Sequence, residues 1–128
     1  MMIDVVAALI WDEDRFLICQ RTNHNARPLL WEFPGGKVNL GESMEDALMR
    51  ELKEELDVTI SVGGLFYDVI HEYSEITIHL TVWNAVIIEG TPQLLEHKAL
   101  QWIILEEIPH YTFCPADDAI TKRMLQRN

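Results

Sequence analysis

Residues 36–58, GKVNLGESMEDALMRELKEELDV, join a glycine turn to a strongly periodic segment. Apolar side chains recur in this segment at intervals of three and four residues, which is typical of the buried face of an α-helix. They are Met44, Ala47, Leu48, Leu52 and Leu56. Ser43 comes just before the pattern and Asp46 stands three residues after it, as in the capping boxes that begin helices. The sequence therefore predicts an amphipathic helix that begins at Ser43.

The opposite face of this helix is acidic. Glu51 lies three and four residues before Glu54 and Glu55, so their carboxylates share one side. Repulsion at these spacings costs about 0.2–0.5 kcal/mol per pair, and the helix dipole disfavours acids near the C-terminal end. One interpretation is a solvated acidic face, balanced in part by Arg50 and Lys53. The other is a site for Mg²⁺, which prefers carboxylate oxygens and keeps waters that phosphate oxygens can replace.

The spacing of Gly36, Glu42 and residues 50–58 resembles the Nudix box of the Nudix hydrolase family, in particular its MutT-like branch. The one departure is Asp57, where the family usually has a glycine that ends the helix in a left-handed conformation. Aspartate tolerates that conformation better than most residues. The resemblance covers nearly the whole chain and implies an α/β (α+β) fold, an α/β/α sandwich with a mixed sheet.

This resemblance also implies a site. Its metal ligands would be the Gly36 carbonyl and four carboxylates, those of Glu51, Glu54, Glu55 and Glu96. Mg²⁺ would be the cofactor, with Mn²⁺ as a substitute. We expect Glu51 to be the general base, although the other three glutamates remain candidates. Glu54 and Arg50 are also assigned to the catalytic group. Arg50 and Glu42 would hold the loop and orient the carboxylates.

The substrate contacts are predicted to come from outside the helix. By the resemblance, Arg21 would contact the nucleotide, and Lys37 is a candidate for the phosphates. Phe33 is a candidate for the base, with a place in the core as the alternative. Asp117 follows Pro-Ala, as in the branch that hydrolyses CTP, and its carboxylate would accept a hydrogen bond from an exocyclic amine. Capping of the C-terminal helix is the other interpretation of this aspartate.

The remaining elements follow from shorter patterns. Strands are expected at 3–10 and 15–20 as a hairpin, at 31–34, at 99–105, and across 58–88 as a long hairpin that turns near Ser74. Gly63-Gly64 indicate a bulge in that hairpin, and residues 115–127 predict a helix. The five histidines include no pair at zinc-ligand spacing.

Composition limits the class of protein. At 128 residues we expect a single domain, 1–128, and no stretch approaches the roughly 20 apolar residues of a membrane span. Two cysteines and the lack of a signal-peptide pattern indicate a cytoplasmic protein. A net charge of −11 argues against a nucleic-acid polymer as partner but is compatible with a metal-bound nucleotide. A monomer and a homodimer both remain open, since the apolar run 86–88 would suit a dimer if exposed.

The expected function is Mg²⁺-dependent hydrolysis of a nucleoside triphosphate to the monophosphate and pyrophosphate, with a preference for cytosine nucleotides or for oxidised ones such as 8-oxo-dGTP. Two alternatives remain. One is a Nudix hydrolase of ADP-ribose or of dinucleoside polyphosphates, and the short chain and Asp117 argue against it. The other is a nucleotide-binding module without activity, which is disfavoured because all the glutamates of the box are present.

Overall fold

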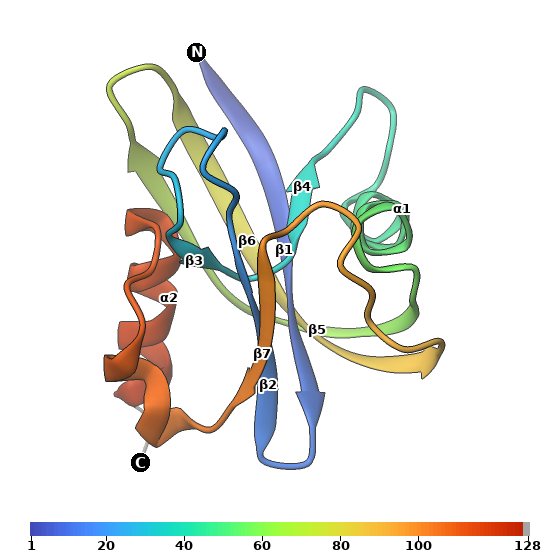
Figure 1. The fold of residues 1–128 in the computed structure, drawn as a ribbon. Coiled ribbons are helices and arrows are strands. Elements are labelled where there is room, and N and C mark those ends of the chain that lie inside the picture. The colour runs from blue at the N-terminus through green and yellow to red at the C-terminus, as the bar shows by residue number, and fades with distance from the viewer. Residues whose placement is uncertain (127–128) are drawn as a thin grey trace.

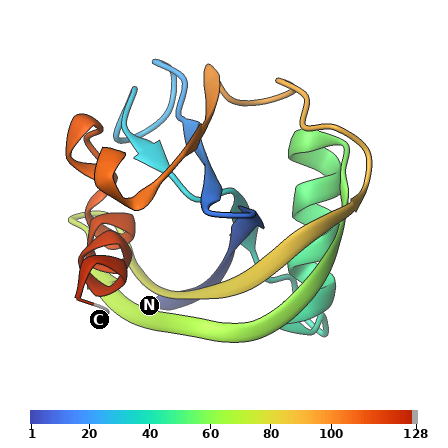
Figure 2. The same ribbon diagram turned by 90° about the horizontal axis from the view of Figure 1, so that it is seen from below.

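Two helices lie on opposite sides of a twisted mixed sheet in the computed structural model (Figure 1 and Figure 2), which describes residues 1–126. Helix α1 (Met44–Leu56) packs on one side and helix α2 (Pro115–Leu125) on the other. This arrangement confirms the α/β/α sandwich expected from the sequence. None of the helices within residues 1–126 is both long enough and apolar enough to cross a membrane.

The described part of the chain has seven strands. They are β1 (Met2–Asp12), β2 (Arg15–Gln20), β3 (Trp31–Glu32), β4 (Gly35–Lys37), β5 (Thr59–Glu72), β6 (Thr77–Glu89) and β7 (Ala99–Ile103). β1 is central and runs parallel to β6 along one edge. Along its other edge it pairs with β4 at residues 5–7 and with β2 only at residues 11–12. β2 in turn carries β3 and β7. β1 and β2 therefore diverge beyond their turn, and β4 takes the place of β2.

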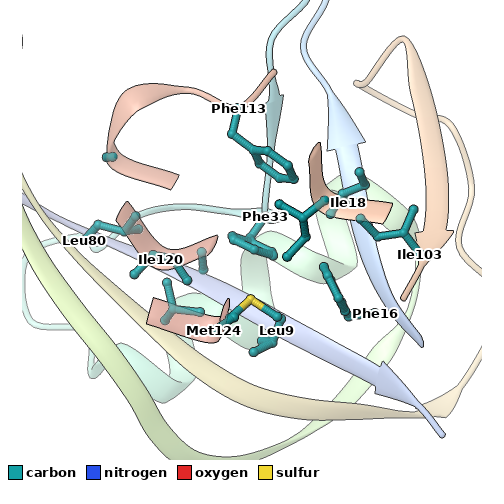
Figure 3. Close-up of a cluster of buried hydrophobic side chains, with 13 residues drawn as sticks. Leu9, Phe16, Ile18, Phe33, Leu80, Ile103, Phe113, Ile120 and Met124 are labelled. Atoms are coloured by element: carbon teal, nitrogen blue, oxygen red, sulfur yellow. The ribbon is translucent and has the colours of Figure 1, made fainter. Parts of the chain in front are cut away.

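The core has one part on each face of the sheet. Along β1, Ala7 and Leu9 belong to the cluster beneath α2, whereas Val6, Ala8 and Ile10 belong to the cluster beneath α1. Successive side chains of a strand point to opposite faces, so a strand covered on both sides has to be apolar throughout. This explains the unbroken apolar run near the N-terminus. Figure 3 shows the α2-side cluster, in which aromatic and aliphatic side chains from the sheet meet the buried face of α2.

Helix α1 begins and ends as the sequence predicts. Ser43 is its N-cap and accepts a hydrogen bond from the Asp46 N–H at 3.1 Å. Asp57 ends it in the left-handed conformation, with φ 56° and ψ 43°, and its N–H donates to the Lys53 carbonyl at 3.1 Å. Aspartate therefore adopts the backbone geometry for which a glycine is usual. The helix places the Nudix-box glutamates at a fixed height along the sheet.

The long hairpin is also confirmed, with β5 and β6 joined by residues 73–76 and a shift of register between Val62 and Leu65. Two expectations differ from the structure. The strand expected at 31–34 ends at Glu32, and a separate strand, β4, begins at Gly35 and pairs with β1 instead of β2. The strand expected at 99–105 ends at Ile103, and a 3₁₀ helix, η1 (Leu105–His110), follows.

A side-chain cap explains this second difference. The Glu107 carboxylate accepts the Ile104 N–H at 2.9 Å, which begins the 3₁₀ turn and ends the strand. For the C-terminal helix, α2 agrees with the prediction up to Leu125, and the predicted end at residue 127 lies outside the described residues.

Candidate functional site

A cavity of about 530 Å³ lies where β1 and β2 diverge. Its wall is formed by strands β1, β4 and β6, by the end of α1, by the loop before β7 and by the first turn of α2. Seven of the residues singled out from the sequence line it: Arg21, Phe33, Gly36, Lys37, Glu55, Glu96 and Asp117. The other four, Glu42, Arg50, Glu51 and Glu54, are not in the wall of the cavity but form an ion-pair network beside it.

Arg50 is the centre of that network. It donates to both oxygens of Glu42, at 2.8 and 3.0 Å, and to the Lys37 carbonyl at 3.0 Å. It also bonds Glu51 at 2.9 Å and Glu54 at 3.1 Å. The hydrogen bonds that Arg50 donates lower the pKa of Glu42 to about 2, and the same bonds to Glu42, Glu51 and Glu54 raise the pKa of Arg50. The arginine therefore ties the glycine loop to the helix and fixes the carboxylates of Glu51 and Glu54.

Glu55 lies in a different environment from the other glutamates of the helix. Its Oε1 atom is buried and has no hydrogen-bond partner among the described residues. Burial, and then the negative charges of Glu32, Glu51 and Glu96, raise the pKa of Glu55 to about 9. A buried carboxylate among other carboxylates is stable in its ionised form only when a positive charge compensates it. Glu55 is therefore the residue that most requires a cation.

The two glycines of the loop are needed for close packing. A Cβ atom on Gly35 would lie 1.9 Å from the carbonyl oxygen of Val6 in β1. A Cβ atom on Gly36 would lie 2.3 Å from the carboxyl carbon of Glu51. Only glycine permits both approaches. Gly36 thereby brings the backbone of the loop directly against the carboxylate that we expect to be the base.

These residues fit a hard divalent cation, because Glu55 offers an unpartnered oxygen and the charges that raise its pKa are those of three further carboxylates. Within residues 1–126 no three Asp, Glu, His or Cys side chains are already grouped as a metal site. Glu51 and Glu54 bond to Arg50. A cation at this place therefore competes with Arg50 for these two carboxylates.

Asp117 is a buried acid in the first turn of α2. Its Oδ1 accepts a hydrogen bond from the Phe33 N–H at 3.0 Å, and the residue lines the cavity. Burial, and then the charge of Glu32, raise the pKa of Asp117 to about 8. Both protonation states are therefore accessible near neutral pH. The side chain does more than cap the helix, since it also bonds the backbone of Phe33, which lies between β3 and β4 and 84 positions away.

Two residues of the site were not found from the sequence, Glu32 and His97. Glu32 accepts from Arg21 at 2.7 Å through one oxygen and pairs with Nε2 of His97 at 3.1 Å through the other. Burial alone would raise the pKa of Glu32, but the hydrogen bonds from His97 and Arg21 outweigh it and lower the pKa. His97 is itself buried, and its Nδ1 has no partner among the described residues. The sequence signal that could have identified Glu32 is an acidic residue between two aromatic ones, Trp31 and Phe33.

Phe33 and Trp31 serve the core. The Phe33 ring is 3% exposed and packs between Phe16 and Phe113, with centroid distances of 6.1 and 5.8 Å (Figure 3). The ring of Trp31 packs edge-on against Tyr111 at 5.0 Å. Since Phe33 also lines the cavity, contact with a bound base stays a prediction for it.

Comparison with known proteins agrees with this geometry. Residues 5–123 match the family described as the NUDIX domain. The CTP pyrophosphohydrolase of Escherichia coli (strain K12) is 43% identical over 116 residues, which cover 91% of this chain and 86% of that protein. The 8-oxo-dGTP diphosphatase of the same organism is 33% identical over 93 residues, covering 73% of this chain and 72% of the relative.

Solved structures give the same result. The solution structure of the E. coli ORF135 protein superimposes with a TM-score of 0.84 and 40% identity, covering 97% of this chain and 89% of that one. The crystal structure of the MutT Nudix hydrolase from Burkholderia pseudomallei has a TM-score of 0.86 and 26% identity, covering 95% of this chain and 97% of that one. By sequence, fold and the loop-helix with its glutamates, the chain belongs to the Nudix hydrolase family.

Proposed function

We propose that this protein hydrolyses nucleoside triphosphates to the nucleoside monophosphate and pyrophosphate, with Mg²⁺ as cofactor and cytosine nucleotides as preferred substrates. Nudix hydrolases generally use divalent metal ions and act on small nucleotide substrates. The observation that carries the proposal is that one cavity is lined both by a buried glutamate that requires a cation and by a buried aspartate suited to a base. The name of the E. coli relative, CTP pyrophosphohydrolase, supports the same substrate class.

The residues that would hold Mg²⁺ are Glu51, Glu54, Glu55, Glu96 and the Gly36 carbonyl. When bound, Mg²⁺ supplies positive charge that neutralises the phosphate groups and polarises a water for attack. Mn²⁺ would substitute for it. The positive charge would offset the burial and the neighbouring carboxylates that now oppose ionisation of Glu55. It would also offset the repulsion between this acidic wall and the triphosphate.

The protein side chains provide the positioning. Glu51 is proposed as the general base, supported by its fixed place between Arg50 and the Gly36 backbone. Arg50 orients the carboxylates rather than contacting the substrate, since its N–H groups bond to glutamates and to a loop carbonyl. Lys37 lines the cavity as a phosphate contact, and Arg21 does so while held by Glu32.

Asp117 is proposed to read the base. In its ionised form Oδ2 accepts a hydrogen bond from an exocyclic amine, such as N4 of cytosine. In its protonated form it donates to an acceptor atom, which favours 8-oxo-dGTP as a second candidate substrate. The raised pKa of about 8 is the observation behind this second candidate. Asp117→Ala should lower kcat/KM for the preferred nucleotide far more than for other triphosphates.

The test is product analysis with Mg²⁺ and then with EDTA. The panel is CTP, dCTP, 5-methyl-dCTP, 8-oxo-dGTP, dGTP, dATP and ADP-ribose. Monophosphate and pyrophosphate from a cytosine nucleotide, lost with EDTA, support the proposal, and a preference for 8-oxo-dGTP selects the second candidate. Hydrolysis of ADP-ribose alone contradicts it. Binding of nucleotides without turnover of any member would indicate a binding module.

We also propose that residues 1–128 form one Nudix domain and that the protein acts in the cytoplasm. The buried free thiols of Cys19 and Cys114 are compatible with a reducing compartment. Both a monomer and a homodimer are compatible with the surface, on which Val86 and Ile88 of β6 are exposed. Light scattering after size-exclusion chromatography distinguishes the two states.

A further inference from the structure

Arg27, in the loop between β2 and β3, lines the cavity but has no role in the chemistry described above. Its guanidinium carbon lies 3.7 Å from the centroid of the Tyr73 ring. Its NH1 group donates to Glu75 Oε2 at 2.8 Å. Tyr73 and Glu75 belong to the turn of the long hairpin and line the same cavity. Arg27 is thus held in a defined orientation at the cavity by two residues that lie 46 and 48 positions further along the chain.

The backbone of this loop is strained. Arg27 has a φ of 56° and Leu29 a φ of 64°, both in the left-handed region that non-glycine residues rarely adopt. Arg27 also precedes Pro28, and a following proline restricts the backbone of the residue before it. Strain of this kind persists only where the surroundings hold the residue, and it concentrates at binding sites.

Tyr73 connects Arg27 to the aspartate that reads the base. Its hydroxyl oxygen accepts the N–H of Ala116 at 3.1 Å, and Ala116 directly precedes Asp117 in the first turn of α2. Tyr73 therefore contacts Arg27 through the face of its ring and the start of α2 through its hydroxyl group. This places Arg27 and Asp117 against the same part of the cavity wall.

The two side chains are complementary in hydrogen bonding. A guanidinium has five N–H donors and no acceptor, and Glu75 uses only part of them. An ionised aspartate only accepts. The edge of a cytosine base presents an amine donor beside ring-nitrogen and carbonyl acceptors, so it matches an acceptor and a donor placed together.

We propose that Arg27 is a specificity-determining residue, which donates hydrogen bonds to the acceptor atoms of the bound base while Asp117 accepts from its amine. This inference rests on the proposed function, because it concerns the nucleotide of that same reaction. Glu75 and Tyr73 are positioning residues that hold the guanidinium plane.

The test compares CTP with ribose 5-triphosphate, which has the sugar and the phosphates but no base. Arg27→Met keeps an apolar stem on Tyr73 and removes every donor. It should lower kcat/KM for CTP by about 10- to 100-fold, mainly through KM, the range for a lost hydrogen bond to a charged group. The change for ribose 5-triphosphate should stay below about threefold. Arg123→Met is the matched control, since Arg123 also stacks on a tyrosine, Tyr67 at 5.1 Å, but does not line the cavity.

Equal losses on both substrates, or no loss on CTP, overturn the proposal, because Arg27 would then serve the sugar, the phosphates or the loop alone. Glu75→Gln is a second variant that keeps the guanidinium but releases it, and it should give a smaller loss with the same dependence on the base. Circular dichroism and thermal unfolding verify that each variant is folded.

If the wild-type protein turns over no triphosphate, the proposed reaction fails, and calorimetric titration with CMP then decides on Arg27. Weaker CMP binding by Arg27→Met, with no change for Arg123→Met, supports the inference. Equal affinities, or a wild-type protein that binds no CMP, overturn it.

Discussion

Replacing Glu55 by glutamine should abolish turnover and, in the metal-free protein, increase stability. The folded, metal-free protein holds Glu55 protonated at neutral pH, because its pKa of about 9 lies far above the ordinary 4.5. In the unfolded chain the same group is ionised at pH 7. Folding therefore takes up a proton, which costs about 3 kcal/mol at pH 7 and below about 1 kcal/mol at pH 5. Glutamine has no such cost.

The sign follows from the direction of the shift. A carboxyl group whose pKa is raised on folding contributes most to stability below about pH 4.5 and loses that contribution as the pH rises towards 9. The stability advantage of Glu55→Gln should consequently grow with pH. Urea unfolding in EDTA at pH 5, 6, 7 and 8 measures it. With Mg²⁺ present the order should reverse, because an ion that binds at the proposed site stabilises the folded state of the wild-type protein.

Turnover of the preferred nucleotide should fall at least about 100-fold in the same variant, since the charge proposed to hold the cation is removed without a change in shape. Glu54→Gln is the matched control for stability. Glu54 is half-exposed and paired with Arg50, so its loss should cost no more than about 1 kcal/mol and show no gain at high pH. A stability difference for Glu55→Gln that is constant from pH 5 to 8, or near wild-type turnover, would refute the reasoning.

Three further changes test other parts of the structure. Gly36→Ala should displace the Glu51 carboxylate and lower kcat by about tenfold or more. Gly64→Ala is the control, because no atom lies within 4 Å of its new Cβ, and it should leave kcat unchanged in steady-state kinetics. Asp57→Gly should stabilise the protein by about 1 kcal/mol, because glycine adopts the left-handed cap without cost, and chemical denaturation that shows a loss contradicts this. His79 pairs with Asp68 and Asp4, and these hydrogen bonds, that to Asp68 first, raise the pKa of the imidazole. The stabilisation from His79 is therefore complete below pH 6.5 and is lost as the pH rises through the raised pKa of the folded state. Thermal unfolding of His79→Gln should differ from the wild type at pH 6 and converge with it at high pH.

Local patterns determined a large part of the fold. The helix 44–56, its serine cap and its aspartate end depend on contacts within four residues, and these are visible in the sequence. The same is true of the two strands of the long hairpin, whose alternation and glycine pair specify pairing and bulge. The box glutamates could be identified because their spacing along one helix is itself a local property.

The short elements around the cavity were less predictable. The crossing from β3 to β4 and the 3₁₀ helix η1 depend on which neighbouring strand is available and on a single side-chain cap. Neither leaves a periodic signal, because each spans too few residues.

What only the tertiary structure decided are the contacts between residues far apart in the chain. Glu32 meets His97 across 65 positions, and Arg27 meets Glu75 across 48. The sequence by itself identified the glutamates of the box, Glu96 and Asp117, but neither Glu32 nor the charge states of these acids. Whether Glu55 is protonated depends on burial and on neighbouring charges, and both are set by how distant strands and loops close around it. Composition and spacing specify which groups are present, whereas their electrostatic environment exists only after the chain has packed.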